Sequence, residues 1–428
     1  MNYQQTIQYL FEKLPMFSRM GAAAFKKDLT NTIALCNALH NPQQKFKTIH
    51  IAGTNGKGSV SHMLAAVLQT AGYKTGLYTS PHLKDFKERI KVNGALCSEE
   101  FIIQFTQKIQ PHIETIQPSF FEITVAMAFE YFAQQQVDIA IIETGLGGRL
   151  DSTNIITPEL SVITNIGYDH MNMLGNALRE IALEKAGIIK QNVSVVIGET
   201  HKETANVFVE KANETNATIV FADKQRWIAD WQYEHHLLNV WVANHFNDEH
   251  EKYSLDLNGI YQTKNLLTVL EALHQLRFKG FEIDKTHILH ALQHTKKITG
   301  LHGRWEVIYQ NPTVVLDVAH NEDGIKQVVQ QLALINFNQL HIIFGMVKDK
   351  AIDNVLEILP KQAYYYFTQA QIERALHAEI LMKKAAGYQL TGNFYTNVNI
   401  ALKEALLNAH KNDLILICGS VFLVGEVE

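Results

Sequence analysis

A glycine-rich stretch with a single lysine constrains this chain more than any other feature, because residues 50–59 read HIAGTNGKGS. Residues 48–52 form an apolar run that predicts a buried strand, and residues 60–69 have the apolar spacing of a helix. A strand, a glycine turn and a helix together direct backbone N–H groups and the positive end of a helix dipole at an anion. Lys57 adds a positive charge for phosphate oxygens, and Ser59 adds a hydroxyl for a magnesium ion. The stretch therefore predicts a nucleotide phosphate loop.

The match of this stretch to the standard phosphate loop is incomplete. That loop has its lysine directly before Ser or Thr, whereas Gly58 separates Lys57 from Ser59 here. The first glycine also lies closer to the second than the standard pattern requires. The alternative is a glycine-rich turn that only connects a strand to a helix. Because such turns rarely carry a lysine in this context, we favour a phosphate loop.

Length and composition describe an ordinary soluble protein of more than one domain. At 428 residues the chain is long for one core, and 46% hydrophobic with 19% charged residues is typical of globular proteins. A net charge of −5 offers no electrostatic footprint for nucleic acid or an acidic membrane. Three scattered cysteines argue against a disulfide framework and against a thiolate zinc site. Without a signal peptide or a membrane-spanning run, we expect a cytoplasmic protein.

Three polar side chains that can bind a metal each come at the end of an apolar run. Ser80, Glu143 and His170 all follow or end a segment that reads as a strand. Ligands of doubly wound sheets bind beyond the carboxyl ends of the strands, so these side chains fall where metal ligands are expected. The alternatives are a simple turn serine at Ser80 and a surface histidine at His170, since the chain has 20 histidines.

The order of predicted elements indicates two α/β domains. Strands and helices alternate up to about residue 200, which predicts a mostly parallel sheet. Residues 201–258 are more polar and carry three tryptophans, and we expect a small antiparallel excursion with its tryptophans used for packing. Few apolar residues surround the lysines and glycines of residues 295–303, which predicts the domain boundary. The predicted fold is a P-loop-type, mostly parallel sheet domain (1–296) plus a smaller Rossmann-like α/β domain (297–428).

The predicted C-terminal domain has a polar cluster of its own. Residues 314–321 read VVLDVAHN, an apolar strand that ends in Asp317 and His320, and Arg304 precedes it just beyond the boundary. A buried Arg–Asp pair between the domains is one interpretation. The functional interpretation is a clamp for a nucleotide or a transition state. ATP and metal on one domain and such a clamp on the other suit a reaction in which ATP activates a carboxylate for attack by an amine.

Five motifs, in order along nearly the whole chain, resemble those of folylpolyglutamate synthases. This family belongs to the Mur ligase superfamily of ATP-dependent amide-forming ligases, and its bacterial members are often bifunctional with dihydrofolate synthase. The motifs are HIAGTNGKGS (50–59), YTSPH (78–82), ETGLGGRLDSTN (143–154), residues 169–187 and DVAHNEDG (317–324).

The resemblance implies roles for the residues that match these motifs. Lys57, Lys185 and His320 match catalytic positions, and Lys185 matches a lysine that the family carries as N6-carboxylysine. A carbamate would turn this cation into an anion that assists magnesium binding, whereas its position near a helix end alone suggests only a dipole partner. The residues that match ATP contacts are Asn55, Gly56, Lys57, Gly58, Ser59, Asn265, Arg304 and Asp317.

The resemblance also implies metal and acceptor sites. Ser80 and Glu143 match ligands of one Mg²⁺, and His170 matches the ligand of a second. Glu122 stands near a helix start, where it could also serve only as a cap. The residues implied in binding the folate or pteroate are Phe17, Ser18, Arg19, Met20, Phe120, Phe121, Glu122, Ile123, Leu150, Asp151 and Ser152.

The predicted activity is the ATP-dependent joining of L-glutamate to a folate carboxyl through an acyl phosphate, and possible dihydrofolate synthesis from dihydropteroate and L-glutamate. The predicted partners are ATP, L-glutamate and a folate or dihydropteroate, with a monomeric chain and with neither nucleic acid nor membrane. A Mur-type ligase acting on a UDP-sugar is one alternative, and turnover with uridine nucleotides would favour it. A nucleotide-gated switch protein is another, and it would hydrolyse ATP slowly without regard to glutamate.

Overall fold

The computed structural model describes residues 1–15, 28–245 and 247–428, and the chain divides into two compact units. Two short segments, Tyr168–His170 and Leu257–Tyr261, belong by their contacts to the C-terminal unit although they precede it in the sequence. Within the described part of the chain, no helix combines the length and apolarity needed to cross a membrane. Unit 1 comprises Met1–Gly167, Met171–Asp256 and Gln262–Leu301, and unit 2 comprises Tyr168–His170, Leu257–Tyr261 and His302–Glu428.

Unit 1 is built on an eight-stranded sheet with the strand order β4-β3-β2-β5-β1-β6-β7-β8. The strands from β2 to β8 in this order are parallel, and β3 and β4 add an antiparallel edge. β1 lies between β5 and β6, so the connections diverge beside it, and ligands of such sheets bind at the carboxyl ends near that point. The strands are β1 (Lys47–Ala52), β2 (Thr75–Tyr78), β3 (Ile90–Val92), β4 (Ala95–Leu96), β5 (Ile139–Glu143), β6 (Leu160–Ile163), β7 (Val195–Ile197) and β8 (Ile219–Phe221).

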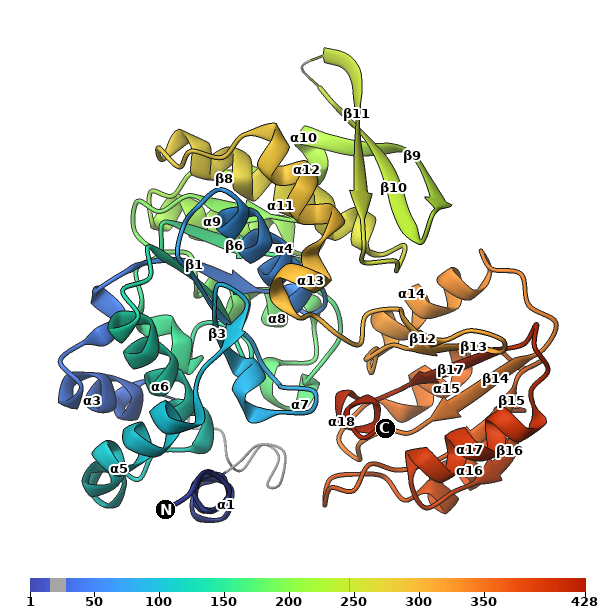
Figure 1. Ribbon diagram of the computed structural model, residues 1–428. Helices are drawn as coiled ribbons and strands as arrows, with labels where there is room; N and C mark the ends of the chain where they lie inside the picture. The colour runs from blue at the N-terminus through green and yellow to red at the C-terminus, as the bar shows by residue number, and fades with distance from the viewer. Residues whose placement is uncertain (16–27, 246) are drawn as a thin grey trace. The chain divides into compact units, whose positions relative to one another are not determined.

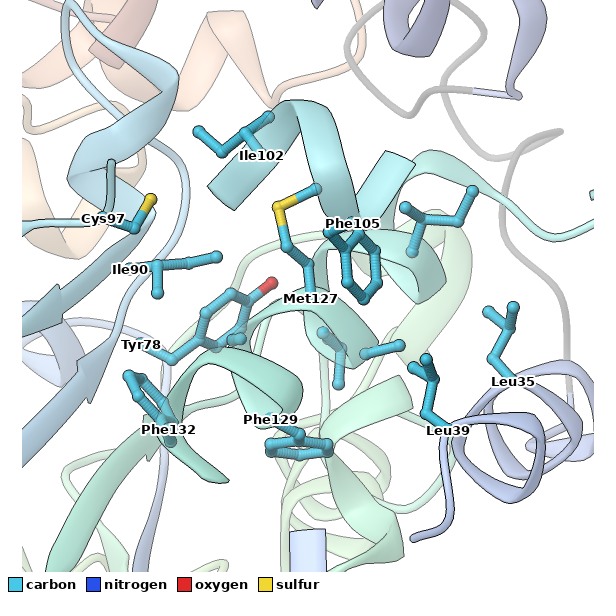
Figure 2. Close-up of a cluster of buried hydrophobic side chains, with 14 of the residues drawn as sticks. Leu35, Leu39, Tyr78, Ile90, Cys97, Ile102, Phe105, Met127, Phe129 and Phe132 are labelled. Atoms are coloured by element: carbon cyan, nitrogen blue, oxygen red, sulfur yellow. The ribbon is translucent and has the colours of Figure 1, made fainter. Parts of the chain in front are cut away.

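The helices of unit 1 bury apolar faces against this sheet. Figure 2 shows one cluster, in which Phe129 and Phe132 lie with Tyr78, Phe105 and Leu35. Each fully buried phenylalanine contributes roughly 2 kcal/mol through the hydrophobic effect. The helices are α1 (Tyr3–Lys13), α3 (Thr30–Ala38), α4 (Lys57–Thr70), α5 (Glu99–Ile116), α6 (Phe120–Gln134), α7 (Met171–Leu174), α8 (Leu178–Ala186), α9 (Ala205–Glu214), α10 (Ala222–Gln225), α11 (Gln262–Phe278), α12 (Lys285–Gln293) and α13 (Thr295–Thr299), with short 3₁₀ helices η2 (Pro42–Gln44), η3 (Phe86–Arg89) and η4 (Ser152–Ile155).

The antiparallel excursion is smaller than predicted. It is a three-stranded sheet in the order β11-β10-β9, visible in Figure 1 apart from the eight-stranded sheet. The prediction for residues 201–258 was wrong over its first part, because α9 buries Phe208 in the main core and leads into β8 of the main sheet. Trp241 lies 5.1 Å from the Lys252 ammonium, measured to the ring centre, whereas Trp227 remains 42% exposed. The three strands are β9 (Arg226–Glu234), β10 (Leu237–Asn244) and β11 (Asn247–Leu255).

Unit 2 is built on a six-stranded sheet with the order β12-β13-β17-β14-β15-β16. Only β12 is antiparallel to its neighbour, so the predicted fold class, a mostly parallel α/β domain with a smaller α/β domain after it, is confirmed. The strands are β12 (Glu306–Tyr309), β13 (Thr313–Leu316), β14 (Leu340–Phe344), β15 (Tyr364–Phe367), β16 (Thr391–Phe394) and β17 (Leu414–Cys418). The helices are α14 (Glu322–Leu332), α15 (Ile352–Ile358), α16 (Ala378–Ala386), α17 (Val398–Asn408) and α18 (Val421–Gly425).

Candidate active site

The glycine-rich loop connects β1 to α4, and the segment after β6 holds it in place. The Asn165 side chain accepts a hydrogen bond from the Asn55 N–H at 2.9 Å, and the Asn165 backbone oxygen accepts one from the Thr54 N–H at 3.0 Å. The Thr164 hydroxyl donates to the backbone oxygen of Asn55 at 2.6 Å. Residues 55–58 remain partly exposed. A braced, partly exposed loop at the start of a helix suits phosphate binding.

Two lysines direct their ammonium groups at one backbone oxygen of this loop. The Lys57 Nζ lies 3.0 Å from the Gly53 oxygen, and the Lys185 Nζ, which comes from α8, lies 2.9 Å from the same atom. Lys185 is only 4% exposed whereas Lys57 is partly exposed, so water screens the charge of Lys185 poorly. This arrangement favours an anion beside the two ammonium groups.

The first turn of α11 packs on the other side of the loop. Gln262 donates to the Ser59 hydroxyl at 3.1 Å and accepts a 2.8 Å hydrogen bond from Asn265. Gly56 has a φ of +83°, and a Cβ added there would collide with the Asn265 side chain. The predicted ATP contacts of unit 1, residues 55–59 and Asn265, therefore form one close-packed group.

We expect Gly56→Ala to weaken ATP binding about tenfold, because the new methyl group must displace Asn265. The positive φ adds a conformational cost of about 1 kcal/mol to folding. Gly72→Ala is a matched control, since Gly72 has a φ of +92° with open space at its Cβ position. Calorimetric titration with ATP and thermal unfolding separate the two effects. Equal losses of ATP affinity in both variants would contradict the role of Asn265.

Ser80 and Glu143 lie at the same end of two neighbouring parallel strands. The register pairs Tyr78 of β2 with Ile142 of β5, so the residues that follow leave the sheet together. Hydroxyl and carboxylate oxygens are the ligands that Mg²⁺ prefers. Thr144 adds a buried hydroxyl that has no hydrogen-bond partner within the described part of the chain. This donor set fits a magnesium ion, although no three His, Cys, Asp or Glu side chains among the described residues form a metal cluster.

A buried arginine, Arg89, stands beside this pair of residues. Its Nε donates to Nδ1 of His82 at 2.8 Å, and its guanidinium lies 5.5 Å from the centre of the Phe120 ring. Burial, and secondarily the charge of Arg89, lowers the pKa of His82 to about 3, so His82 is neutral and accepts this hydrogen bond. The guanidinium also attracts Glu143. Arg89 thus links the loop after Ser80 to the carboxylate at the end of β5.

The residues predicted to bind the acceptor through α6 are mostly buried. Phe120 and Ile123 are buried, and the buried Glu122 carboxylate accepts a 2.6 Å hydrogen bond from the backbone at the start of its own helix. Phe121 is partly exposed, with its ring against Gly145. Phe121 is therefore the side chain of this group most able to touch a ligand. Four further predicted residues, Phe17, Ser18, Arg19 and Met20, lie outside the described residues.

The remaining predicted acceptor residues, Leu150, Asp151 and Ser152, lead into η4. The Asp151 carboxylate is 2% exposed and accepts hydrogen bonds from the Leu146 N–H at 2.8 Å and from the Thr153 N–H at 3.0 Å. Burial raises the pKa of Asp151, and its hydrogen bonds oppose this shift. Leu150 and Ser152 are partly exposed on either side of it.

In unit 2, Asp317 follows β13 and holds together the residues that are predicted to bind the nucleotide there. It is 2% exposed and accepts hydrogen bonds from the Tyr261 hydroxyl at 2.7 Å, the Ala319 N–H at 2.9 Å and the Trp305 N–H at 3.0 Å. Burial raises the pKa of Asp317, while these hydrogen bonds and the charge of Arg304 oppose the shift. Arg304 and Asp317 are thus brought together, and Tyr261 joins them.

A second carboxylate of unit 2, Asp169, joins residues from three parts of the sequence. It forms an ion pair with Lys350, accepts a 3.1 Å hydrogen bond from Asn321 and lies 3.4 Å from Nε2 of His320. Burial alone would raise the pKa of Asp169, but Lys350, together with His320 and His170, holds it well below its usual value. The Lys350 Nζ also lies 3.3 Å from Nε2 of His170. His170 therefore fits a metal only after Lys350 moves.

We expect Lys350→Met to lower the free energy of unfolding by about 3 kcal/mol, because it leaves the nearly buried Asp169 without its cation. This difference in the free energy of unfolding should have its full size at neutral pH. It should shrink as the pH falls below about 4, the ordinary pKa of aspartate, because Asp169 then becomes protonated in the unfolded chain. Urea unfolding measures both effects. Lys383→Met removes an exposed pair and should change the free energy of unfolding far less. Equal effects of the two variants would contradict the buried pair.

Family models and relatives match this geometry. Residues 51–273 match the Mur ligase middle domain, and residues 303–421 match the Mur ligase glutamate ligase domain. The chain is 32% identical to the dihydrofolate synthase/folylpolyglutamate synthase of Bacillus subtilis, over 99% of this chain and 98% of that protein. The chain belongs to this family of Mur ligases. An Escherichia coli structure, FolC in complex with DHPP and ADP, superposes on this Mur ligase with a TM-score of 0.84 at 27% identity and covers 99% of this chain and 96% of that one.

Another similar structure bears on the metal. The bifunctional folylpolyglutamate synthase/dihydrofolate synthase of Yersinia pestis, complexed with AMPPNP and Mn ion, has a TM-score of 0.82 and 25% identity to this Mur ligase, over 99% of this chain and 97% of that one. Residues of the candidate site in this Mur ligase that were missed from sequence include Arg89, Asp169, Tyr261 and Lys350. Each joins the site through a partner distant in sequence. The position of Asp169 directly before His170 was the one available indication.

Proposed function

We propose that this chain is an ATP-dependent ligase that attaches L-glutamate to a carboxyl group of a folate, and that it also joins L-glutamate to dihydropteroate. The observation that carries the proposal is the loop at Gly53, where Lys57 and Lys185 meet at the carboxyl end of the sheet, with Ser80 and Glu143 on the next strands. Such a place suits a triphosphate and its metal. The names of the relatives, which include both activities, support the choice of glutamate and acceptor.

In the proposed reaction, an oxygen of the acceptor carboxylate attacks the γ-phosphorus of ATP, and ADP leaves. The glutamate nitrogen then attacks the carbonyl carbon of the acyl phosphate, phosphate leaves, and the nitrogen loses a proton. Lys57 offsets negative charge on the transferred phosphoryl group. Asn265, Arg304 and Asp317 bind the nucleotide together with the loop, and His320 lies on the glutamate side.

Ser80 and Glu143 would hold a magnesium ion, which when bound offsets charge on the phosphate oxygens. The oxygen donors of these residues support this assignment, as does the manganese named in the related structure. We place a second metal at His170. That site requires the Lys350 ammonium to leave Nε2 of His170, and the neighbouring Asp169 would then offer its carboxylate.

We propose that Lys185 acts as N6-carboxylysine. The support is electrostatic: without modification, a buried ammonium of Lys185 faces the ammonium of Lys57 across the Gly53 oxygen. A carbamate replaces this repulsion with attraction and adds two oxygens that suit magnesium.

The acceptor is proposed to lie against Phe121 and residues 150–152, with the buried residues of α6 as their support. We also propose that residues 1–296 act as the ATP-binding domain and residues 297–428 as the glutamate-ligase domain of a monomeric enzyme.

The test of the proposed function is ADP release by the full chain with ATP, Mg²⁺ and L-glutamate, comparing dihydropteroate with tetrahydrofolate as acceptor. We expect release to require both glutamate and one of these acceptors, and activity with both compounds would establish the two activities. Release that depends on a UDP-sugar would replace the proposal with a peptidoglycan-type ligase. Slow release that ignores glutamate would replace it with a nucleotide switch.

A further inference from the structure

A buried histidine connects the strand of the phosphate loop to the proposed acceptor segment. His50 lies in β1, three residues before Gly53, and is fully buried. Its Nε2 is 2.8 Å from the Thr153 hydroxyl, and that hydroxyl is 2.5 Å from Oδ1 of Asp151. Residues 103 positions apart in the sequence thus meet in one chain of hydrogen bonds.

The positions of the protons in this chain of hydrogen bonds follow from its donor groups. Oδ1 of Asp151 accepts from the Thr153 N–H at 3.0 Å, and therefore also accepts from the Thr153 hydroxyl. The hydroxyl oxygen then accepts from His50, which must carry its proton on Nε2. Nδ1 of His50 is buried with no hydrogen-bond partner among the described residues, as expected for the unprotonated nitrogen. Burial, and secondarily the charge of Lys190, lowers the pKa of His50 to about 3, so the ring is neutral at physiological pH.

We propose that His50 is a positioning residue for the acceptor, acting through Thr153 to fix the carboxylate of Asp151. This inference rests on the proposed function, since it takes residues 150–152 to border the acceptor. The second carboxylate oxygen of Asp151 accepts from the Leu146 N–H at 2.8 Å, so both oxygens are bound and the carboxylate cannot rotate. Removing His50 takes away the donor that fixes the rotamer of the Thr153 hydroxyl, and so weakens the contact of this hydroxyl with Asp151. The acceptor segment is thereby oriented from the same strand that carries the phosphate loop.

The test compares KM values of full-length variants for the acceptor and for ATP. We expect His50→Leu to raise the KM for the acceptor about tenfold while changing the KM for ATP less than about twofold. His50→Gln retains a side-chain N–H near the Nε2 position and should restore most of the loss. Thr153→Val should raise the KM for the acceptor as much as His50→Leu does. The double variant should have no higher KM than either single variant, because both changes break the same chain of hydrogen bonds.

Ser161→Ala is the matched control. Ser161 faces His50 in the register of β6 with β1, is fully buried and donates a 2.8 Å hydrogen bond to Ile188, but has no link to Asp151. Its KM values should stay unchanged. Equal effects on both substrates, or the same acceptor effect in Ser161→Ala, would overturn the proposal.

A second readout does not depend on turnover. In ¹⁵N-histidine NMR spectra of the wild-type protein, His50 should be in the neutral form that is protonated on Nε2. It should not titrate above about pH 5. A proton on Nδ1, or titration near neutral pH, would overturn the proposal even if the chain used other substrates. Conversely, a wild-type chain that shows this proton but no acceptor-dependent ADP release would refute the proposed function and leave the hydrogen-bond chain established.

Discussion

Lys57→Met is expected to lower kcat for ADP release about 10³-fold, the cost of removing a charge that stabilises a transferring phosphoryl group. The ammonium of Lys57 lies at the Gly53 and Thr54 oxygens, at the start of the loop that should hold the phosphates. Initial rates of ADP release with saturating ATP, glutamate and acceptor measure the effect.

The control for Lys57 is Lys211→Met, which removes a partly exposed lysine of unit 1 paired with Glu214 on the surface. Its kcat should remain within about twofold of the wild type, because surface pairs contribute little. Both variants should unfold at nearly the same temperature. A Lys57→Met enzyme that keeps most of its kcat would show that the loop does not bind the transferred phosphate.

Lys185→Ala is expected to lose activity by a similar factor, and short carboxylates such as formate or acetate should restore part of it. If Lys185 is the proposed carboxylysine, its neutral amine would attack CO₂ and lose a proton, which gives a carbamate. A small carboxylate can occupy the space vacated by Lys185 and supply the same negative charge beside Lys57. Titrating ADP release against carboxylate concentration measures the recovery.

Lys185→Arg separates the carbamate from a simple need for positive charge. Arginine keeps a cation that can reach the Gly53 oxygen but forms no carbamate, so this variant should be as inactive as Lys185→Ala and should not respond to acetate. Full activity of Lys185→Arg would contradict the carboxylysine. Rescue of Lys185→Ala by ammonium-type compounds instead of carboxylates would contradict it as well.

The parts of the site that depend on local sequence were predictable. The glycine-rich stretch after an apolar run became a strand, loop and helix, and Ser80 and Glu143 came at the ends of neighbouring parallel strands. These features follow from periodicity and from the rule that ligands bind at the carboxyl ends of parallel strands. The start of the antiparallel excursion was less predictable, because the buried face of α9 is formed by a few apolar residues within a polar segment.

Contacts between distant segments could not be derived from sequence. Lys350 reaches Asp169 across 181 positions, and Tyr261 reaches Asp317 across 56, so neither pair leaves a local pattern. The burial of Glu122 is similar: its position near a helix start allowed a cap, but only the folded structure shows that the carboxylate is buried and accepts the Ser119 N–H. The hydrogen-bond chain from His50 to Asp151 likewise depends on the sheet bringing η4 beside β1.

In the proposed reaction, ATP activates the acceptor carboxyl before glutamate attacks. The most direct test uses a folate labelled with ¹⁸O in the carboxyl group that receives glutamate, followed by mass spectrometry of the inorganic phosphate. We predict one ¹⁸O atom in each phosphate released, together with a product one glutamate longer. Unlabelled phosphate, released at the same rate as ADP, would contradict an acyl phosphate intermediate.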